Sequence, residues 1–243
     1  MSELVDDLNE LREELDVLQQ QAEETSRRLS PVQGADETAS VSVKLSETGS
    51  FQSATVNPGW RSRISAEELG SAVLMALANA AGKRMEQYAE VQSDVEETES
   101  FTARPAGLDP RVEQLSKNLQ AQSGERADAS LAQTMDLLNE MLAGLDRAEA
   151  LVDAHGTQEY VGRSGKGRVT ATVTGESSVT AVSINPKWLA TAHEVNLSRE
   201  ITQAIRAALD QAAASGLASI MDATGLAAYQ SLLGNNTTPK PGR

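Results

Sequence analysis

The chain has 243 residues, and its 35 acidic and 21 basic side chains give a formal net charge of −14. The absence of cysteine excludes disulfides, thiolate metal sites and thiol catalysis, while two histidines are too few for a histidine-rich metal centre. Few aromatic residues (two Trp, three Tyr, two Phe) exclude an aromatic-rich surface for bases or sugars, and an acidic chain repels nucleic acid unless its basic residues gather locally.

The first predicted element is an acidic amphipathic helix. Residues 1–25 carry nine acidic residues and one arginine, a net charge of −8. These acidic side chains form a solvated face, hold a basic protein partner or mimic DNA. Five leucines recur at a spacing of 4-3-4-3, which is typical of the apolar seam of a coiled-coil-like helix. They are Leu4, Leu8, Leu11, Leu15 and Leu18.

Neither a leader nor a membrane segment is expected. The acidic N-terminus lacks the positive region of a signal peptide. The longest apolar run, residues 72–81, is about half of the ~20 residues that span a bilayer. We therefore expect a cytoplasmic protein that makes no membrane contact.

A β hairpin and a second helix follow. Val41–Leu45 and Phe51–Val56 alternate as strands around a turn at residues 46–49, whereas the polar run 33–40 is typical of a loop. Ser65 and Glu68 form a capping box, which predicts a helix from Leu69 toward Glu97. Residues 99–128 contain two prolines and two glycines and are interpreted as a linker.

The same order of elements returns after the linker. A strand at residues 159–161 leads into the glycine-rich run 162–168, and Val169–Thr174 and Val179–Ile184 form a hairpin. A helix is expected from about Asn196, weakened or kinked at Gly216 and Gly225, with a disordered tail at residues 234–243. A second 4-3-4-3 seam precedes these strands at Leu131, Met135, Leu138, Leu142 and Leu145.

An internal repeat relates the two halves at an offset of 128 residues. Val-Asn-Pro-Gly-Trp at residues 56–60 matches Ile-Asn-Pro-Lys-Trp at 184–188, and these segments hold the only two tryptophans. Apolar positions coincide on both sides, as Leu69 with Leu197 and Val73 with Ile201. The sequence predicts a tandem duplication with copies at residues 1–98 and 129–233, the linker at 99–128 and the tail at 234–243.

This pattern resembles the YbaB/EbfC family of nucleoid-associated DNA-binding proteins. A strand ending at Gly162, a β-branched strand and an Ile-Asn-Pro step before a long helix carry the resemblance over residues 160–213, and more weakly over 41–81. Asn57 and Asn185 stand where the family usually has Asp. The resemblance implies an α+β protein in which two tandem helix–β-meander–helix repeats form an intramolecular pseudo-dimer, since the family forms DNA-binding homodimers.

The candidate binding residues are basic side chains of the two sheet regions. Residues 26–65 and 156–192 each carry a net charge of +2 within a strongly acidic chain. We expect these side chains to contact DNA phosphates, although short basic loops are also ordinary solvated turns. The predicted DNA-binding residues are Arg163, Lys166, Arg168, Lys187, Arg61, Arg63 and Lys44.

The remaining motifs indicate structural roles rather than ligand-binding or catalytic roles. Lys166 is followed by Gly167, so residues 162–168 are not a phosphate-binding Walker A loop. Trp60 and Trp188 either stack on bases or fill a strand-to-helix corner, and the asparagines before proline either read adenine or serve turns. No catalytic constellation, metal site or cofactor site is evident, so an enzyme is not expected.

Two functions follow. The first is a non-enzymatic nucleoid-associated protein that binds double-stranded DNA. The alternative is a protein–protein adaptor or chaperone-like accessory of a type VII secretion system, which binds a basic partner through the acidic coiled-coil helices. Both are compatible with self-association through the leucine seams.

Overall fold

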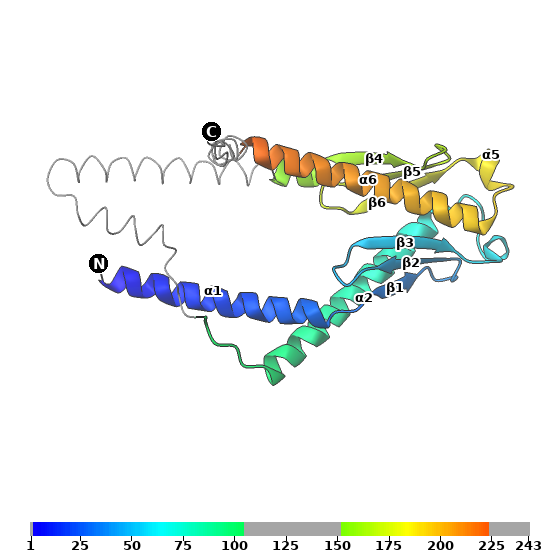
Figure 1. Cartoon of the computed structure of the whole chain (residues 1–243). Coiled ribbons are helices and arrows are strands. Elements are labelled where there is room, and N and C mark those ends of the chain that lie inside the picture. Colours follow the sequence, from blue (N-terminus) through cyan, green and yellow to red (C-terminus); the bar gives the residue numbers. More distant parts are fainter. Residues whose placement is uncertain (1, 105–151, 224–243) are drawn as a thin grey trace, which may run out of the picture. The chain divides into compact units, whose positions relative to one another are not determined.

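The computed structural model describes residues 2–104 and 152–223 (Figure 1). The chain divides into unit 1, residues 1–105, 160–173 and 178–209, and unit 2, residues 106–159, 174–177 and 210–243. Almost all of both predicted sheets belongs to unit 1. The second leucine seam, Gly225 and the tail at 234–243 lie outside the described residues, as do the side chains of Leu4, Leu8 and Leu11.

The protein belongs to the α+β class, as the sequence predicts. Two three-stranded antiparallel sheets have the strand orders β1-β2-β3 and β4-β5-β6. The first half contains α1 (Ser2–Arg28), β1 (Val32–Ala35), β2 (Val41–Leu45), β3 (Phe51–Val56), the 3-10 helix η1 (Trp60–Ser62) and α2 (Leu69–Thr98). The second half contains β4 (Glu159–Arg163), β5 (Val169–Thr174), β6 (Val179–Ile184), α5 (Pro186–Leu189) and α6 (Glu194–Ala223).

The two hairpins share one register. Val41 lies opposite Val56, and Val169 lies opposite Ile184. Every further pair of the two hairpins also corresponds at an offset of 128, including the point at which a bulge shifts the register. Both hairpins match the strand bounds expected from the sequence, because alternating β-branched residues mark strands buried on one face.

The prediction of a loop throughout residues 33–40 is wrong, because Val32–Ala35 forms β1. The cause is a close approach that a single sequence does not display. A Cβ on Gly34 would lie 2.2 Å from the backbone nitrogen of Ala80 in α2. Gly162 in β4 has the same contact with α6, where its Cβ would lie 2.2 Å from the nitrogen of Ala208.

The helix α6 continues through Gly216 to Ala223, so the weakening or kink expected at Gly216 does not end the helix. Gly216 packs instead against an imidazole of unit 2, since its Cβ would lie 2.6 Å from Nε2 of His155. That histidine lies in a helical segment, residues 152–157, rather than in a loop. The helix therefore uses Gly216 for packing, and the local cost of glycine is outweighed by tertiary contact.

The core of unit 1 lies where each long helix covers its sheet. Small helix residues face the two close-packed glycines, and branched residues fill the space around them. The side chains with no exposed surface include Val41, Val43, Leu69 and Val73 in the first half and Val169, Val173, Leu197, Ile201 and Ile205 in the second.

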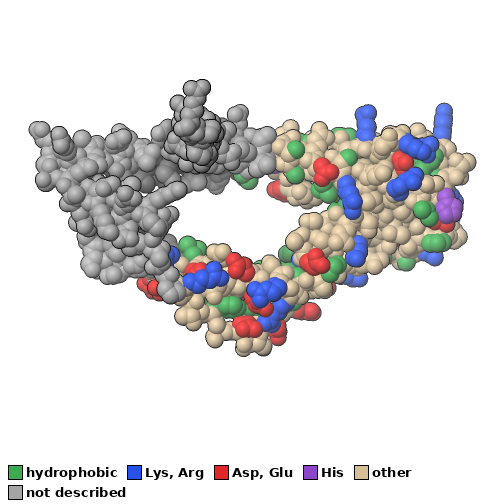
Figure 2. Space-filling view, in the orientation of Figure 1, with side chains coloured by type: hydrophobic (Ala, Val, Ile, Leu, Met, Phe, Trp, Pro, Cys, Tyr) green, Lys and Arg blue, Asp and Glu red, His purple; other side chains and the backbone are tan. Residues whose placement is uncertain are grey.

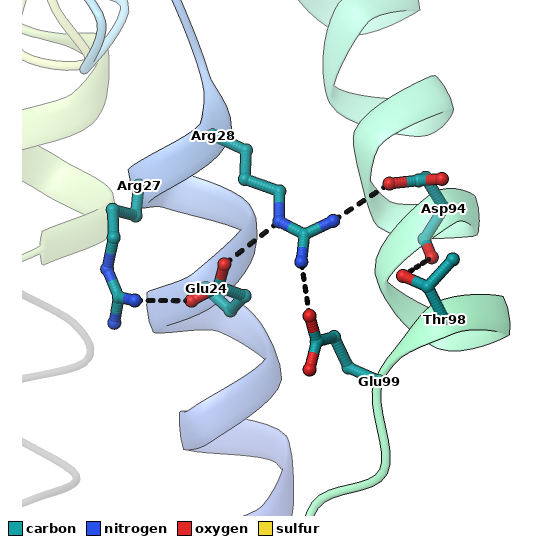
Figure 3. Close-up of polar contacts among 6 residues, drawn as sticks. All are labelled: Glu24, Arg27, Arg28, Asp94, Thr98 and Glu99. Atoms are coloured by element: carbon teal, nitrogen blue, oxygen red, sulfur yellow. Dashed lines mark hydrogen bonds and ion pairs between the residues drawn. The ribbon is translucent and has the colours of Figure 1, made fainter.

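The end of α1 packs against the end of α2, with Thr25 and Val95 buried. Figure 3 shows Arg28 reaching from α1 between three carboxylates: its guanidinium lies 2.9 Å from Glu24, 2.8 Å from Asp94 and 2.5 Å from Glu99. The hydrogen bond from Arg28 holds the pKa of Glu24 below its usual value. Further along α1, the seam residues Leu15 and Leu18 are more than half exposed. Among the described helices, none has the length and apolarity needed to cross a membrane.

The glycine contact predicts a sharp difference between two alanine substitutions. We expect Gly34→Ala to lower the free energy of unfolding by about 2 kcal/mol or more, because its Cβ would meet helix backbone that cannot rotate away. Gly82→Ala is the matched control in α2, where a Cβ meets nothing within 4 Å, and it should raise stability by about 0.5–1 kcal/mol. Urea unfolding followed by circular dichroism measures both, and equal effects would contradict the packing role.

Candidate nucleic-acid interface

The candidate surface is organised by two equivalent turns, each of which follows the first strand of its sheet. We call residues 36–40 the acidic turn and residues 164–168 the basic turn. The nitrogen of Ala39 donates to the carbonyl of Asp36 at 3.0 Å, and that of Gly167 donates to the carbonyl of Ser164 at 2.8 Å. Ala39 and Gly167 are both left-handed, with φ of 54° and 64°. The two turns therefore have one backbone conformation.

In each turn, the side chain of the first residue accepts a hydrogen bond from the backbone nitrogen of the residue that follows the turn. In the acidic turn, Oδ1 of Asp36 accepts from the nitrogen of Val41 at 2.6 Å. In the basic turn, Oγ of Ser164 accepts from the nitrogen of Val169 at 3.2 Å. A carboxylate and a hydroxyl thus perform the same task in the two halves.

Asp36 is 6% exposed and accepts further bonds from the backbone nitrogen and the hydroxyl of Thr38. Burial acts to raise the pKa of Asp36, but the hydrogen bonds from Thr38, Val41 and Ser40 together outweigh burial and lower it. The carboxylate is therefore held in its charged form.

The turns differ in charge. The acidic turn contains two carboxylates and no basic residue, whereas the basic turn contains Lys166 and Arg168 and no acidic residue. Lys166 is exposed, and the half-buried Arg168 places its guanidinium 5.1 Å from the centroid of the Trp188 ring. In Figure 2, the Lys and Arg side chains in view predominate over the part of unit 1 that carries the sheets and α5.

Of the remaining predicted site residues of the second half, one directly precedes the basic turn and the other lies in α5. Arg163 is exposed at the last position of β4, directly before the turn, and Lys187 is exposed in α5. Lys44 is exposed on β2 of the first half. Within the described residues, no hydrogen bond or ion pair is seen for the side chains of Arg163, Lys187 and Lys44.

Arg61 and Arg63 make structural contacts that the sequence did not predict. Nη2 of Arg61 donates to the carbonyls of Leu189 and Ala192, each at 2.8 Å, and so joins η1 to the segment around α5. Nη1 of Arg63 donates to the carbonyl of Ala39 in the acidic turn at 2.8 Å. Part of the hydrogen-bonding capacity of both guanidinium groups is therefore used within unit 1.

Trp60 and the two asparagines before proline make structural contacts. Trp60 is 1% exposed beneath Arg61, whose guanidinium lies 4.5 Å from the ring centroid. Asn185 caps α5 by accepting from the nitrogens of residues 187 and 188, and Nδ2 of Asn57 donates to the carbonyl of Ala39 at 2.8 Å. The short helix α5 was not expected, although Asn before Pro is a recognisable start signal.

The outer edge of β3 is hydrogen-bonded by side chains of α6, a contact that sequence reasoning missed. Three polar residues at successive turns of α6 face this edge. Ser198 accepts from the nitrogen of Val56 at 2.8 Å, Thr202 bonds both the nitrogen and the carbonyl of Ala54, and Arg206 donates to the carbonyl of Gln52. The polar spacing i, i+4, i+8 was the available signal.

The counterpart contact between α2 and β6 has no such bonds. Gly70, which corresponds to Ser198, lets α2 approach so closely that a Cβ would lie 2.4 Å from the carbonyl oxygen of Val182. The next two counterparts, Leu74 and Ala78, are apolar. The edge of β3 is therefore covered through side-chain hydrogen bonds from α6, whereas the edge of β6 is covered by the close packing of α2.

No described group of three or more His, Asp or Glu side chains could hold a metal ion. Of the histidines, His193 lies 3.8 Å from Glu194, and His155 packs against Gly216 as described above.

The acidic turn predicts a pH-dependent effect of Asp36→Asn. The folded pKa of Asp36 is lowered, so its contribution to stability is present above the unfolded pKa and is lost as the pH falls through the folded pKa. We expect the variant to lose about 1–3 kcal/mol at pH 7, and this loss should shrink as the pH falls below about 4, the pKa of an unperturbed aspartate. Ser164→Ala is the control, because its loss should not vary over this range. Urea unfolding at pH 7 and at steps down to pH 3 checks both, and a difference independent of pH for Asp36→Asn would contradict the assignment.

A comparison with protein families identifies a match in the second half of the chain. Residues 126–226 match the model of the YbaB/EbfC DNA-binding family. This range includes β4, β5, β6, α5 and most of α6, and with them the basic turn. A search of curated proteins found no match. Residues 126–226 of this chain are therefore similar to the YbaB/EbfC DNA-binding family.

Proposed function

We propose that this chain is a non-enzymatic, nucleoid-associated protein that binds the phosphate backbone of duplex DNA through basic side chains near the ends of its sheets. The observation that carries the proposal is the position of the exposed cations. Arg163, Lys166 and Lys187 lie within the segment that matches a DNA-binding family, and the basic turn contains no acidic residue. Arg168, Arg61, Arg63 and Lys44 are further candidates.

The proposed mechanism is electrostatic. Lysine and arginine neutralise phosphates and release counterions, which gives affinity without base readout and makes it sensitive to salt. The net charge of −14 does not oppose this mechanism everywhere, since nine acidic residues lie within the first 25 positions. Those acidic residues lie on α1 and outside both turns.

We further propose that the two halves are tandem copies that form a pseudo-dimer within one chain, with copies at residues 1–98 and 129–233 and a linker at 99–128. Three observations support this proposal: the common register of the hairpins, the common glycine contacts of Gly34 and Gly162, and the packing of α6 against the edge of β3. The YbaB/EbfC family is known for homodimers, so a fused pair would supply both partners at once.

A second candidate function is a protein–protein adaptor or chaperone-like accessory of a secretion system. The observation that favours an adaptor is the exposure of Leu15 and Leu18, 57% and 58%, on a strongly acidic helix. Exposed seam leucines flanked by carboxylates would suit a basic amphipathic helix.

DNA binding is tested by fluorescence anisotropy with a labelled 25-base-pair duplex at low salt. We expect binding whose affinity falls with salt, and we expect the double variant Arg163→Gln/Lys166→Gln to reduce the slope of log Kd against log salt by about 0.9 for each phosphate that is no longer neutralised. Arg27→Gln is the control, because Arg27 is exposed at the end of α1 and belongs to neither turn; it removes one positive charge, whereas the double variant removes two. A wild-type chain that fails to bind duplex at tens of micromolar would exclude the DNA-binding function and leave the adaptor.

A further inference from the structure

We propose that the chain engages DNA from one side, with the basic turn against the duplex and the acidic turn held away from it. This inference rests on the proposed DNA-binding function. It adds which half of the molecule meets the duplex, and it means that the bound complex lacks the two-fold symmetry of a homodimer on DNA.

The first step is that the two turns are equivalent in backbone but not in side chains. Beyond the bonds already described, the nitrogen of Asp36 donates to Val41 at 3.1 Å and that of Ser164 donates to Val169 at 3.0 Å. Each turn is also tied to the residue after the third strand, because Asn57 donates to the carbonyl of Ser40 and Asn185 to that of Arg168, both at 2.8 Å. The two turns therefore have the same backbone hydrogen bonds but carry different side chains.

The second step is that the basic residues of the second half have no basic counterpart in the first. The offset of 128 places Ala35, Thr38, Ser40 and Gly59 where the second half has Arg163, Lys166, Arg168 and Lys187. Glu37, which is exposed, stands where the second half has Gly165. A phosphate that fits the basic turn would meet a carboxylate at the equivalent place of the first half.

The third step concerns the two arginines of the first half. Arg63 donates to the carbonyl of Ala39, and Arg61 donates to two carbonyls near α5. Arg61 therefore supplies charge beside the second half, whereas Arg63 stands at the acidic turn with Asp36 and Glu37. The balance of charge directs DNA toward the second half.

The absence of cysteine allows a direct test on the full chain. A single cysteine is introduced at either of two equivalent positions, Gly165→Cys or Glu37→Cys, and is labelled with a benzophenone photo-cross-linker. Gly165 has room for a side chain, since its Cβ would meet only the end of Gln203 at 3.7 Å. Glu37→Cys removes a repelling carboxylate, which biases the comparison against the proposal.

Each protein is irradiated with the labelled duplex under the conditions of the anisotropy assay, and circular dichroism checks that both variants fold. We expect the label at position 165 to cross-link to DNA at least fivefold more than the label at position 37. In parallel, Lys166→Gln should weaken binding about threefold to tenfold, and Glu37→Gln should leave Kd within twofold.

The outcomes separate this inference from the function on which it rests. Equal cross-linking at both positions, or a Glu37→Gln variant that binds more than threefold more tightly, would overturn one-sided engagement while leaving DNA binding intact. Binding by anisotropy with cross-linking at neither position would place DNA elsewhere on the chain and overturn the inference. A wild-type chain that binds no duplex would overturn the proposed function together with the inference.

Discussion

The packing of unit 1 depends on how closely the backbones of helix and strand approach each other at two glycines. Gly34 and Gly162 have no Cβ, so α2 and α6 come within reach of the strand backbone, and any other residue would push the helix away. The helices must then carry small residues at the contact, which are Ala76 and Ala80 in α2 and Ala204 and Ala208 in α6. The alanine-rich composition of these helices is thus a requirement of packing, and it brings branched side chains of the sheets into a continuous core.

The sequence predicts those elements whose signals are local. Both hairpins appear with the expected bounds because their residues alternate, and α2 appears with its capping contact, in which the nitrogen of Ser65 donates to Glu68 at 2.8 Å. The strand β1 was missed because its defining feature, a glycine against a distant helix, exists only in three dimensions. The contact of Arg61 with the segment after α5 is likewise invisible in a linear pattern, so a residue expected at a binding surface has a structural role as well.

Local charge, rather than net charge, decides what the surface can bind. A value of −14 suggests a protein that avoids nucleic acid, but charges act over about a Debye length, ~10 Å at moderate salt. The acidic residues of the first 25 positions lie on α1, whereas the basic turn lies between β4 and β5. The same backbone turn can therefore carry opposite charge in two halves of one protein without any change of fold, since the strand ends are held by Asp36 in one case and by Ser164 in the other.

The side-chain hydrogen bonds from α6 to the edge of β3 have no equivalent between α2 and β6, so the two halves differ at this contact. Ser198, Thr202 and Arg206 satisfy four backbone groups of that strand, and the counterparts Gly70, Leu74 and Ala78 have no side-chain group that could do so. In two first halves placed together, these four groups of β3 would lack their side-chain partners. The edge of β3 and the polar residues of α6 are therefore matched within one chain.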